Sequence, residues 1–114
     1  MIPWEELISI EGLDPLVKRS EQGPVVLFKH SVRCGLSAMV KDDLEASEGI
    51  PAIPWYHLDL IQHRAVSDEI AERFGVQHES PQLLLIEHGR CTGHWSHRAV
   101  GVEELNQALT AQHN

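Results

Sequence analysis

Hydrophobic residues along the chain fall into short runs of two kinds, continuous and alternating. Residues 25–29 and 82–87 are continuous apolar runs of strand length, which is typical of strands buried on both faces of a sheet. Residues 55–60 instead alternate between apolar and polar positions, which predicts a further strand. The His88–Gly89 pair indicates a hairpin turn. The predicted strands are residues 4–10, 25–29, 55–60, 82–87 and 90–95. The first rests on a weak alternation only and could instead be one helical turn.

Other segments space their apolar side chains three and four residues apart, as amphipathic helices do. In the first of these segments, Asp14 is expected to cap a helix that has Pro15 at its first position and ends near residues 23–24. In the second, the apolar face is expected to include Met39. The other predicted helices run from a start within residues 30–37 to about residue 47, over residues 64–74 with Gly75 as the stop, and over residues 102–111.

The order of these elements predicts the fold class. Strands alternate with helices through most of the chain, and a hairpin and one more helix close it. This order favours an α/β fold in which a mixed sheet of four to five strands carries helices on both faces. The length of 114 residues is that of one ordinary domain, so we expect residues 1–114 to form a single domain.

Charge and composition exclude several classes of function. Nine Lys and Arg residues stand against 17 Asp and Glu residues, for a net charge of -8. A nucleic-acid-binding protein needs a basic face, and so does a protein that docks on anionic membranes. We therefore expect neither nucleic acid nor membrane as a partner. The eight histidines lack the spacing of a zinc hydrolase helix, so no metal site is expected.

The cellular compartment follows from what the sequence lacks. No apolar run reaches the roughly 18–20 residues of a membrane span, and no signal peptide is visible at the start. We therefore expect a cytoplasmic protein. In that reducing setting the two cysteines, Cys34 and Cys91, should be free thiols at rest.

Cys34 points most directly to chemistry. It follows a buried strand and lies at or just before the start of the second predicted helix. Unpaired N–H groups and the helix dipole favour an anion at such a position, and a thiolate is an anion. Arg33 beside it and Lys29 in the preceding strand add positive charge. A buried structural cysteine is the alternative, but the strand-to-helix position favours a reactive thiol.

Two further residues extend this candidate site. Ser37 stands where a Cys-x-x-Cys pair has its second sulfur, and its hydroxyl can donate a hydrogen bond to the Cys34 thiolate but cannot form a disulfide. It could equally be an ordinary polar residue in the first turn of a helix. Pro81 directly precedes a buried strand, where its peptide bond is either a candidate cis bond or that of a trans proline at a strand start. The motif predicts exchange of one thiol at a time, completed by an outside thiol.

The segments around these residues resemble a known family. Residues 28–31, Phe-Lys-His-Ser, lead into Cys34-x-x-Ser37, and residues 78–82 read His-Glu-Ser-Pro-Gln. Together they look like the YtxJ-type monothiol bacilliredoxins, also called general stress protein YtxJ, a branch of the thioredoxin-like superfamily. The resemblance covers roughly residues 4–112.

The resemblance implies a thioredoxin-like fold and a redox activity on small thiols. Family members remove the low-molecular-weight thiol bacillithiol from mixed disulfides on proteins. The attacking cysteine then corresponds to Cys34, the motif serine to Ser37, and the cis-proline facing the thiol to Pro81. By the same resemblance, thiolated client proteins and a bacillithiol-like co-substrate are the expected partners, with no bound cofactor. The residues expected to contact the substrate are Ser31, Arg33, Gly35 and Ser80.

The chain also departs from the family pattern. The family motif usually has proline after the cysteine and often threonine before it, where this chain has Gly35 and Arg33. Gly35 should loosen the first helical turn and Arg33 adds charge, which affects redox properties and substrate preference more than the fold. Cys91 is not expected to be a resolving partner, because its predicted cross-strand neighbours, about Leu85 or Ile86, lie some 13–17 Å from the active end.

Two other functions compete with the bacilliredoxin interpretation. In one, the chain is a redox-inert thioredoxin-fold binding module. In the other, it is similar to monothiol glutaredoxins, which use glutathione or a bridged iron–sulfur cluster and whose usual motif is Cys-Gly-x-Ser. Residues 34–37 fit that motif literally, while the segments on either side of it favour the bacilliredoxins.

Overall fold

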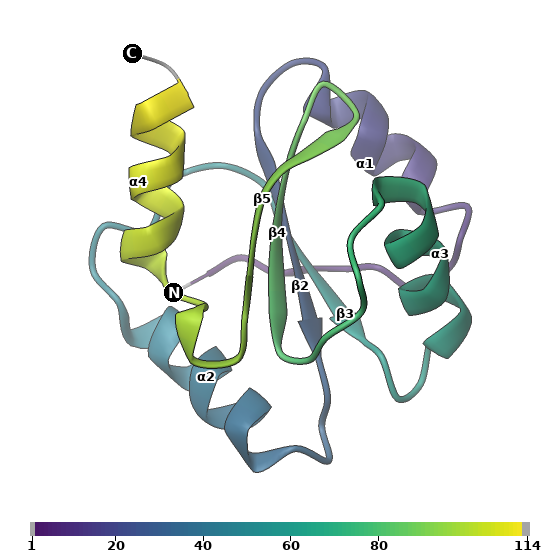
Figure 1. Cartoon of the computed structure of the whole chain (residues 1–114), viewed down its shortest axis with the longest axis horizontal. Helices are drawn as coiled ribbons and strands as arrows, with labels where there is room; N and C mark the ends of the chain where they lie inside the picture. The colour runs from purple at the N-terminus through teal and green to yellow at the C-terminus, as the bar shows by residue number, and fades with distance from the viewer. Residues whose placement is uncertain (1, 113–114) are drawn as a thin grey trace.

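The computed structural model describes residues 2–112, which form one five-stranded mixed sheet with helices on both faces (Figure 1). The strands are β1 (Glu5–Glu6), β2 (Val25–His30), β3 (Trp55–Asp59), β4 (Gln82–Glu87) and β5 (Arg90–Ser96). The helices are α1 (Leu13–Ser20), α2 (Gly35–Ala46), α3 (Arg64–Phe74), the 3-10 turn η1 (His97–Ala99) and α4 (Val102–Gln112). Within residues 2–112, none of the helices combines the length and apolar character of a membrane span.

The sheet has the order β1-β3-β2-β4-β5. Strands β1, β3 and β2 are parallel, whereas β4 runs antiparallel to β2 and β5 antiparallel to β4. Strand β2 therefore lies at the centre, and the chain leaves its carboxyl end to enter α2. This architecture confirms the predicted α/β class and mixed sheet.

Alternate residues of β2 face two separate cores. Val25 and Leu27 pack with α1 and α3, whereas Val26 and Phe28 pack with α2 and α4. Figure 1 shows the same division, with α1 and α3 on one side of the strands and α2 and α4 on the other. Because both faces are covered, the whole strand is buried, which explains its continuous apolar run.

The predicted strand over residues 4–10 is mostly wrong. Only Glu5–Glu6 forms ladder pairs, and one further backbone bond follows, in which the Leu7 N–H donates to the His57 carbonyl at 2.9 Å. The chain then turns, with the Gly12 N–H donating to the Ser9 carbonyl at 3.2 Å. Leaving the sheet early lets the chain cross to the face that α1 covers.

The expected capping of the first helix is also wrong. Gly12 is the N-cap, so Asp14 and Pro15 lie inside the first turn, and the helix ends at Ser20 rather than near residues 23–24. Burial decides this start, because Leu13, the first helical residue, is completely buried. Asp14 still lies where the positive end of the helix dipole favours an acid.

Helix α2 begins and ends close to its predicted limits, but its buried face differs from the expected one. Met39 is 43% exposed, while Ser37, Val40 and Leu44 are buried. Ser37, Val40 and Leu44 follow one another at helical spacing and form the side of α2 that faces the sheet. The sequence pattern therefore missed a polar residue on the inward face.

Other predicted elements match closely. Helix α3 covers the predicted residues and ends at Gly75, whose φ of 66° is the left-handed conformation of a helix stop. His88 and Gly89 both have positive φ and form the predicted hairpin turn between β4 and β5.

Candidate active site

Cys34 occupies the N-cap of α2, directly after the turn that leaves β2. Its extended backbone, with φ −110° and ψ 117°, joins the turn to the helix. The Cys34 N–H donates to the Ser31 carbonyl at 3.2 Å, and its carbonyl accepts from the Ala38 N–H at 3.1 Å. The thiol is free and half-buried. The sulfur thus combines partial solvent access with a helix N-terminus, which suits a reactive thiolate.

Ser37 makes different contacts from those expected. It is completely buried, its Oγ lies 2.7 Å from His30 Nδ1, and it accepts a hydrogen bond from the Ser31 N–H at 3.1 Å. The side chain therefore ties the first turn of α2 to the end of β2. Sequence reasoning proposed a bond from Ser37 to the Cys34 sulfur, and it had no signal for these two partners.

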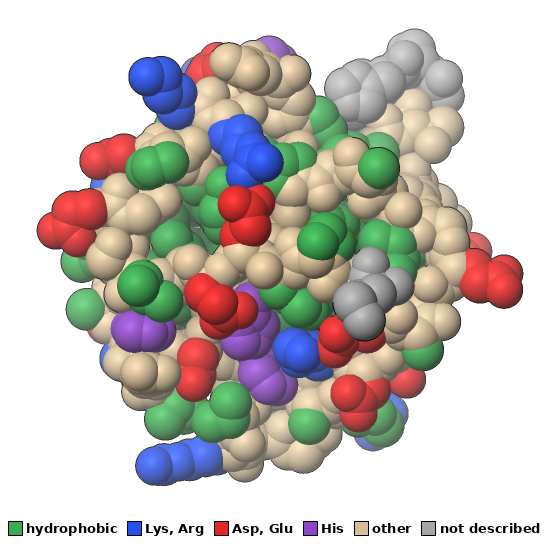
Figure 2. Space-filling view, turned by 180° about the vertical axis from the view of Figure 1, so that it is seen from behind, with side chains coloured by type: hydrophobic (Ala, Val, Ile, Leu, Met, Phe, Trp, Pro, Cys, Tyr) green, Lys and Arg blue, Asp and Glu red, His purple; other side chains and the backbone are tan. Residues whose placement is uncertain are grey.

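A chain of polar side chains continues from His30 across the sheet. The His30 ring is stacked on Phe28 at a centroid distance of 5.8 Å and lies 5.4 Å from the His57 ring. His57 Nδ1 in turn lies 2.8 Å from Glu6 Oε1. Histidine side chains reach the surface together, next to acidic groups, on the face shown in Figure 2.

The surroundings of His30 favour its neutral form. Burial is the largest factor that lowers the pKa of His30, and the electrostatic interactions with His57 and Lys41 lower it further. Asp59 and Asp42 act in the opposite direction with smaller effect. His30 is 7% exposed, so its ring is a largely desolvated base beside the helix that carries Cys34.

Lys29, the neighbour of His30 in β2, points to the opposite face. Its side chain is completely buried, and Nζ lies 3.5 Å from the Ser67 carbonyl of α3 and 3.4 Å from His78 Nδ1. Burial lowers the pKa of Lys29 to about 8, and Asp68 partly counteracts this. The ammonium is therefore directed to α3, away from α2, which corrects the expectation that it adds charge beside Cys34.

Pro81 and Ser80 lie at the same end of the sheet as the start of α2. The Ser80–Pro81 peptide is cis. Gln82 pairs with Lys29, so the preceding Pro81 stands beside the carboxyl end of β2. The Pro81 carbonyl accepts from the His97 N–H at 2.9 Å, and the buried Ser80 Oγ has no hydrogen-bond partner among residues 2–112. The structure thus brings these residues to the edge where Cys34 lies.

The other residues expected to contact a substrate differ in exposure. Arg33 is exposed beside Cys34, while Ser31 is 8% exposed and holds its backbone bonds to Cys34 and Ser37. Gly35 is the first residue of α2, and a Cβ there would meet no atom within 4 Å. A side chain at this position would therefore begin in open space, so glycine is not demanded by packing around its Cα.

Cys91 lies at the far end of the β4–β5 hairpin. It pairs with Ile86, which confirms the expected cross-strand position, and the β4 strand separates this end from Gln82 at the other. Its Sγ donates to the Gly93 carbonyl at 3.2 Å, and burial raises the pKa of its thiol. Cys91 is thus a protonated, hydrogen-bonded thiol outside the candidate site.

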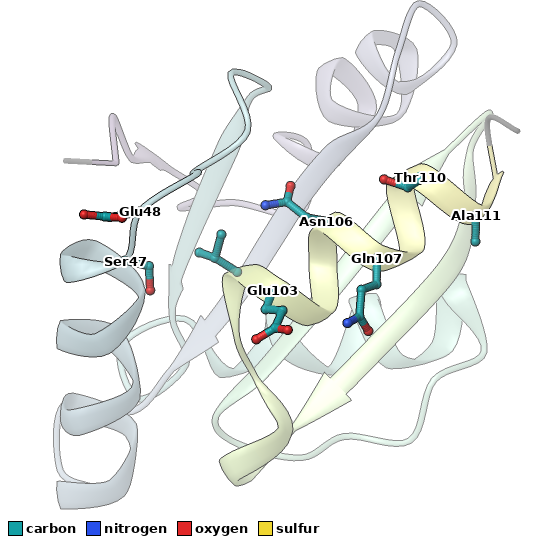
Figure 3. Close-up of a pocket in the computed structure, with 8 residues that line it drawn as sticks. Ser47, Glu48, Glu103, Asn106, Gln107, Thr110 and Ala111 are labelled. Carbon is teal, nitrogen blue, oxygen red and sulfur yellow. The ribbon is translucent and has the colours of Figure 1, made fainter.

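Two hollows in the surface lie away from Cys34. One of about 780 Å³ lies between the end of α2 and α4, with Glu48, Glu103, Asn106 and Thr110 among its lining residues (Figure 3). Another of about 830 Å³ is lined by Arg19 and residues 49–55. Residues 2–112 contain no group of three or more His, Cys, Asp or Glu side chains placed to hold a metal ion. Cys34 is accordingly a partly exposed thiol that lies outside both hollows.

Comparisons with known proteins agree with this arrangement. The model of the family described as monothiol bacilliredoxin BrxC matches residues 5–105. A solved structure described as a candidate oxidoreductase with a thioredoxin fold is 30% identical, with a TM-score of 0.81 over 93% of each chain.

Thioredoxins are similar at lower identity. The Fasciola hepatica thioredoxin is 18% identical with a TM-score of 0.68, over 96% of this chain and 97% of its own. The Malassezia sympodialis thioredoxin is 16% identical with a TM-score of 0.73, over 97% and 94%. These two likenesses show that the fold is that of thioredoxin, as the sequence resemblance implied.

Proposed function

Since this chain belongs to the monothiol bacilliredoxin family, a family of thiol redox proteins with the thioredoxin fold, we propose that Cys34 removes a low-molecular-weight thiol from mixed disulfides on client proteins. The small thiol is bacillithiol or a close relative. The protein works in the cytoplasm with thiolated proteins as partners, and it needs no bound cofactor, nucleic acid or membrane.

The reaction consists of two exchange steps. The Cys34 thiolate attacks the small-thiol sulfur of the client disulfide, so that a Cys34–small-thiol disulfide forms and the client leaves as a thiolate, which takes a proton from water. An external thiol then attacks the small-thiol sulfur. This second step releases Cys34 as a thiolate and produces a disulfide between the external thiol and the small thiol.

One observation carries the one-thiol mechanism. The half-buried Cys34 thiol stands at the start of α2, and the position of a resolving sulfur is filled by the buried hydroxyl of Ser37. Cys91 lies at the opposite end of β4 and is hydrogen-bonded there. A disulfide needs Cα atoms within about 7 Å, so Cys91 cannot resolve the mixed disulfide on Cys34. An outside thiol must do so.

The supporting residues follow from the same geometry. Pro81 and Ser80 stand at the edge beside the carboxyl end of β2, where they would align an extended client or the small thiol along Cys34. Arg33 is exposed next to the thiol and supplies a positive charge for an anionic small thiol. Gly35 leaves open space at the helix start.

A second candidate is glutathione-based chemistry, which the Cys34-Gly35-Leu36-Ser37 motif favours. The two small thiols can be separated directly. The reduced protein is mixed with a bacillithiolated client and, separately, with the same client glutathionylated. Intact-mass spectrometry then measures the small-thiol adduct on Cys34, and the visible spectrum of the purified protein tests for an iron–sulfur cluster.

We expect the bacillithiol adduct to form at least tenfold faster than the glutathione adduct. Cys34→Ser should form neither adduct. Cys91→Ser is the matched control and should behave as the wild type, because its thiol lies outside the site. Transfer from neither client would leave a redox-inert binding module as the function.

A further inference from the structure

Ser37 has two polar partners but only one hydrogen to donate. Its Oγ accepts from the Ser31 N–H at 3.1 Å and lies 2.7 Å from His30 Nδ1. The side chain is completely buried, so water does not supply a substitute partner. The direction of the Ser37 hydroxyl hydrogen therefore depends on whether His30 Nδ1 carries a proton.

The two neutral forms of His30 have opposite consequences. With its proton on Nε2, His30 accepts the hydrogen bond of the Ser37 hydroxyl at Nδ1. Ser37 then has no further hydrogen to donate to another acceptor. With its proton on Nδ1, His30 donates to Ser37 Oγ, as the Ser31 N–H does. The oxygen then accepts twice, and its own hydrogen is free to point elsewhere.

We assign the Cys34 sulfur as the acceptor of this hydrogen from the spacing of the two residues along the helix. Cys34 is the N-cap of α2 and Ser37 is the third residue of the helix. Residues three apart at a helix start lie on one face, one turn apart, so the hydroxyl can turn toward the sulfur without a change of the backbone. A thiolate at Cys34 would gain a hydrogen bond from a serine hydroxyl that His30 and Ser31 have oriented.

We propose that His30 is a positioning residue for thiol exchange: when Nδ1 carries the proton, His30 frees the Ser37 hydroxyl to donate to the Cys34 thiolate. The proposal deepens the proposed function and rests on it. When a mixed disulfide forms, the sulfur loses its charge. His30 then releases its proton from Nδ1 and takes one up on Nε2 from solvent, and the Ser37 hydroxyl donates a hydrogen bond to Nδ1.

The packing around His30 suits this role, because it holds the ring while leaving its proton mobile. Phe28 stacks on the ring, and His57 lies beside it. His57 Nδ1 lies 2.8 Å from Glu6 Oε1, and its Nε2 has no hydrogen-bond partner among residues 2–112.

The charged groups around the ring keep His30 neutral near pH 7. On α2, Lys41 lowers the pKa of His30 and Asp42 raises it. On β3, His57 lowers this pKa and Asp59 raises it. Burial is the strongest influence and lowers the pKa of His30. Both neutral forms are therefore available during a catalytic cycle.

The first test is a double-mutant cycle on the alkylation of Cys34 by iodoacetamide at pH 7, which requires no client. His30→Phe keeps an aromatic ring for Phe28 but removes Nδ1, and we expect it to slow alkylation roughly tenfold. His30→Asn retains an amide that can donate to Ser37 Oγ and should recover most of the rate.

In the Ser37→Ala background, His30→Phe should change the rate by less than about twofold, because the hydroxyl on which His30 acts is gone. A tenfold loss in both backgrounds would overturn the proposal. His88→Asn, in the exposed distal turn with a backbone conformation that asparagine tolerates, is the matched control and should keep the wild-type rate.

The second test uses the wild-type chain, so a poorly folded variant does not affect it. Long-range proton–nitrogen NMR spectra distinguish the two neutral forms of His30 at pH 8. We expect Nδ1–H to dominate in the reduced protein and Nε2–H after Cys34 is capped with methyl methanethiosulfonate. An unchanged His30 signal would overturn the proposal. A chain that exchanged no thiol with any client could still show this coupling, so the two failures are distinguishable.

Discussion

Lys29 and His30 are neighbours in one strand, yet they are buried in opposite ways. Both lie at the carboxyl end of β2, with exposed fractions of 0% and 7%. His30 is a neutral ring with a 2.7 Å contact to Ser37 on the α2 side. Lys29 is a base whose nearest partners, on the α3 side, stand at 3.4 and 3.5 Å.

The difference shows that distance along the chain is a poor guide to distance from the thiol. Strand alternation sends Lys29 to the face opposite α2, while His30 meets the helix that Cys34 begins. The two faces also differ in energy, because short bonds satisfy the neutral His30 network whereas long contacts only partly compensate a buried ammonium.

The largest effect should come from Lys29→Met. Burial lowers the pKa of Lys29 from 10.5 to about 8, so the unfolded chain binds the proton more tightly. The charge therefore destabilises the fold by roughly 3 kcal/mol at pH 7, and stability rises between about pH 8 and 10.5. Methionine, of similar length and without charge, should raise the free energy of unfolding at pH 7 by a comparable amount.

Urea denaturation at pH 7 and pH 10 measures this change. The gain of the variant over the wild type should shrink at pH 10, where Lys29 is largely neutral in the folded chain. Lys18→Met, on the exposed side of α1, is the matched control and should change stability little. A Lys29→Met variant less stable than the wild type would mean that the contacts to Ser67 and His78 outweigh desolvation.

The next largest effect is the loss of stability when a buried serine is replaced by alanine, and it should differ between the two faces of the sheet. Ser37→Ala leaves the buried Ser31 N–H and the His30 ring without their shared partner and should lower the free energy of unfolding by about 2 kcal/mol. Ser67→Ala removes one contact, to the exposed His78, and should lower it by about 1 kcal/mol. Equal losses in thermal or urea unfolding would contradict the proposed difference between the two faces.

The smallest effect concerns acid sensitivity. Burial lowers the pKa of His30, and partial burial lowers the pKa of the largely exposed His78, so below pH 6.5 the unfolded chain binds protons more readily than the folded one. Stability should therefore fall as the pH drops through this range. Replacing either residue with asparagine should flatten the decline measured between pH 7 and pH 5, and His30→Asn should flatten it more, because His30 is the more buried. A steeper decline in either variant would contradict this.

Much of the fold was predictable because the relevant signals are local. Strand β2 was evident from its continuous apolar run, and α3 and the β4–β5 turn from their spacing and from Gly75 and Gly89. The N-terminal segment was not predicted correctly, because its short strand and the start of α1 depend on how Leu13 reaches the core.

The candidate site was predictable to a similar extent. The position of Cys34 at the start of α2 follows from a strand run and a helix stripe that are adjacent in sequence. The pairing of His57 with Glu6 depends on strand order, since β1 and β3 are far apart in the chain. The partners of Ser37 depend instead on how the turn after β2 folds onto the first turn of α2. The roles of Cys34, Ser37 and Pro81 in exchange stay predictions.

The sequence by itself determined the α/β class, the lone thiol at a helix start and the serine in place of a second sulfur, because each is written in residues close together along the chain. Only the tertiary structure decided what surrounds that serine and which way Lys29 and His30 point. The Ser37 contacts arise where the end of β2 folds onto the first turn of α2, and the two side chains of β2 point toward different helices. The packing of these helices on the sheet has no local signature.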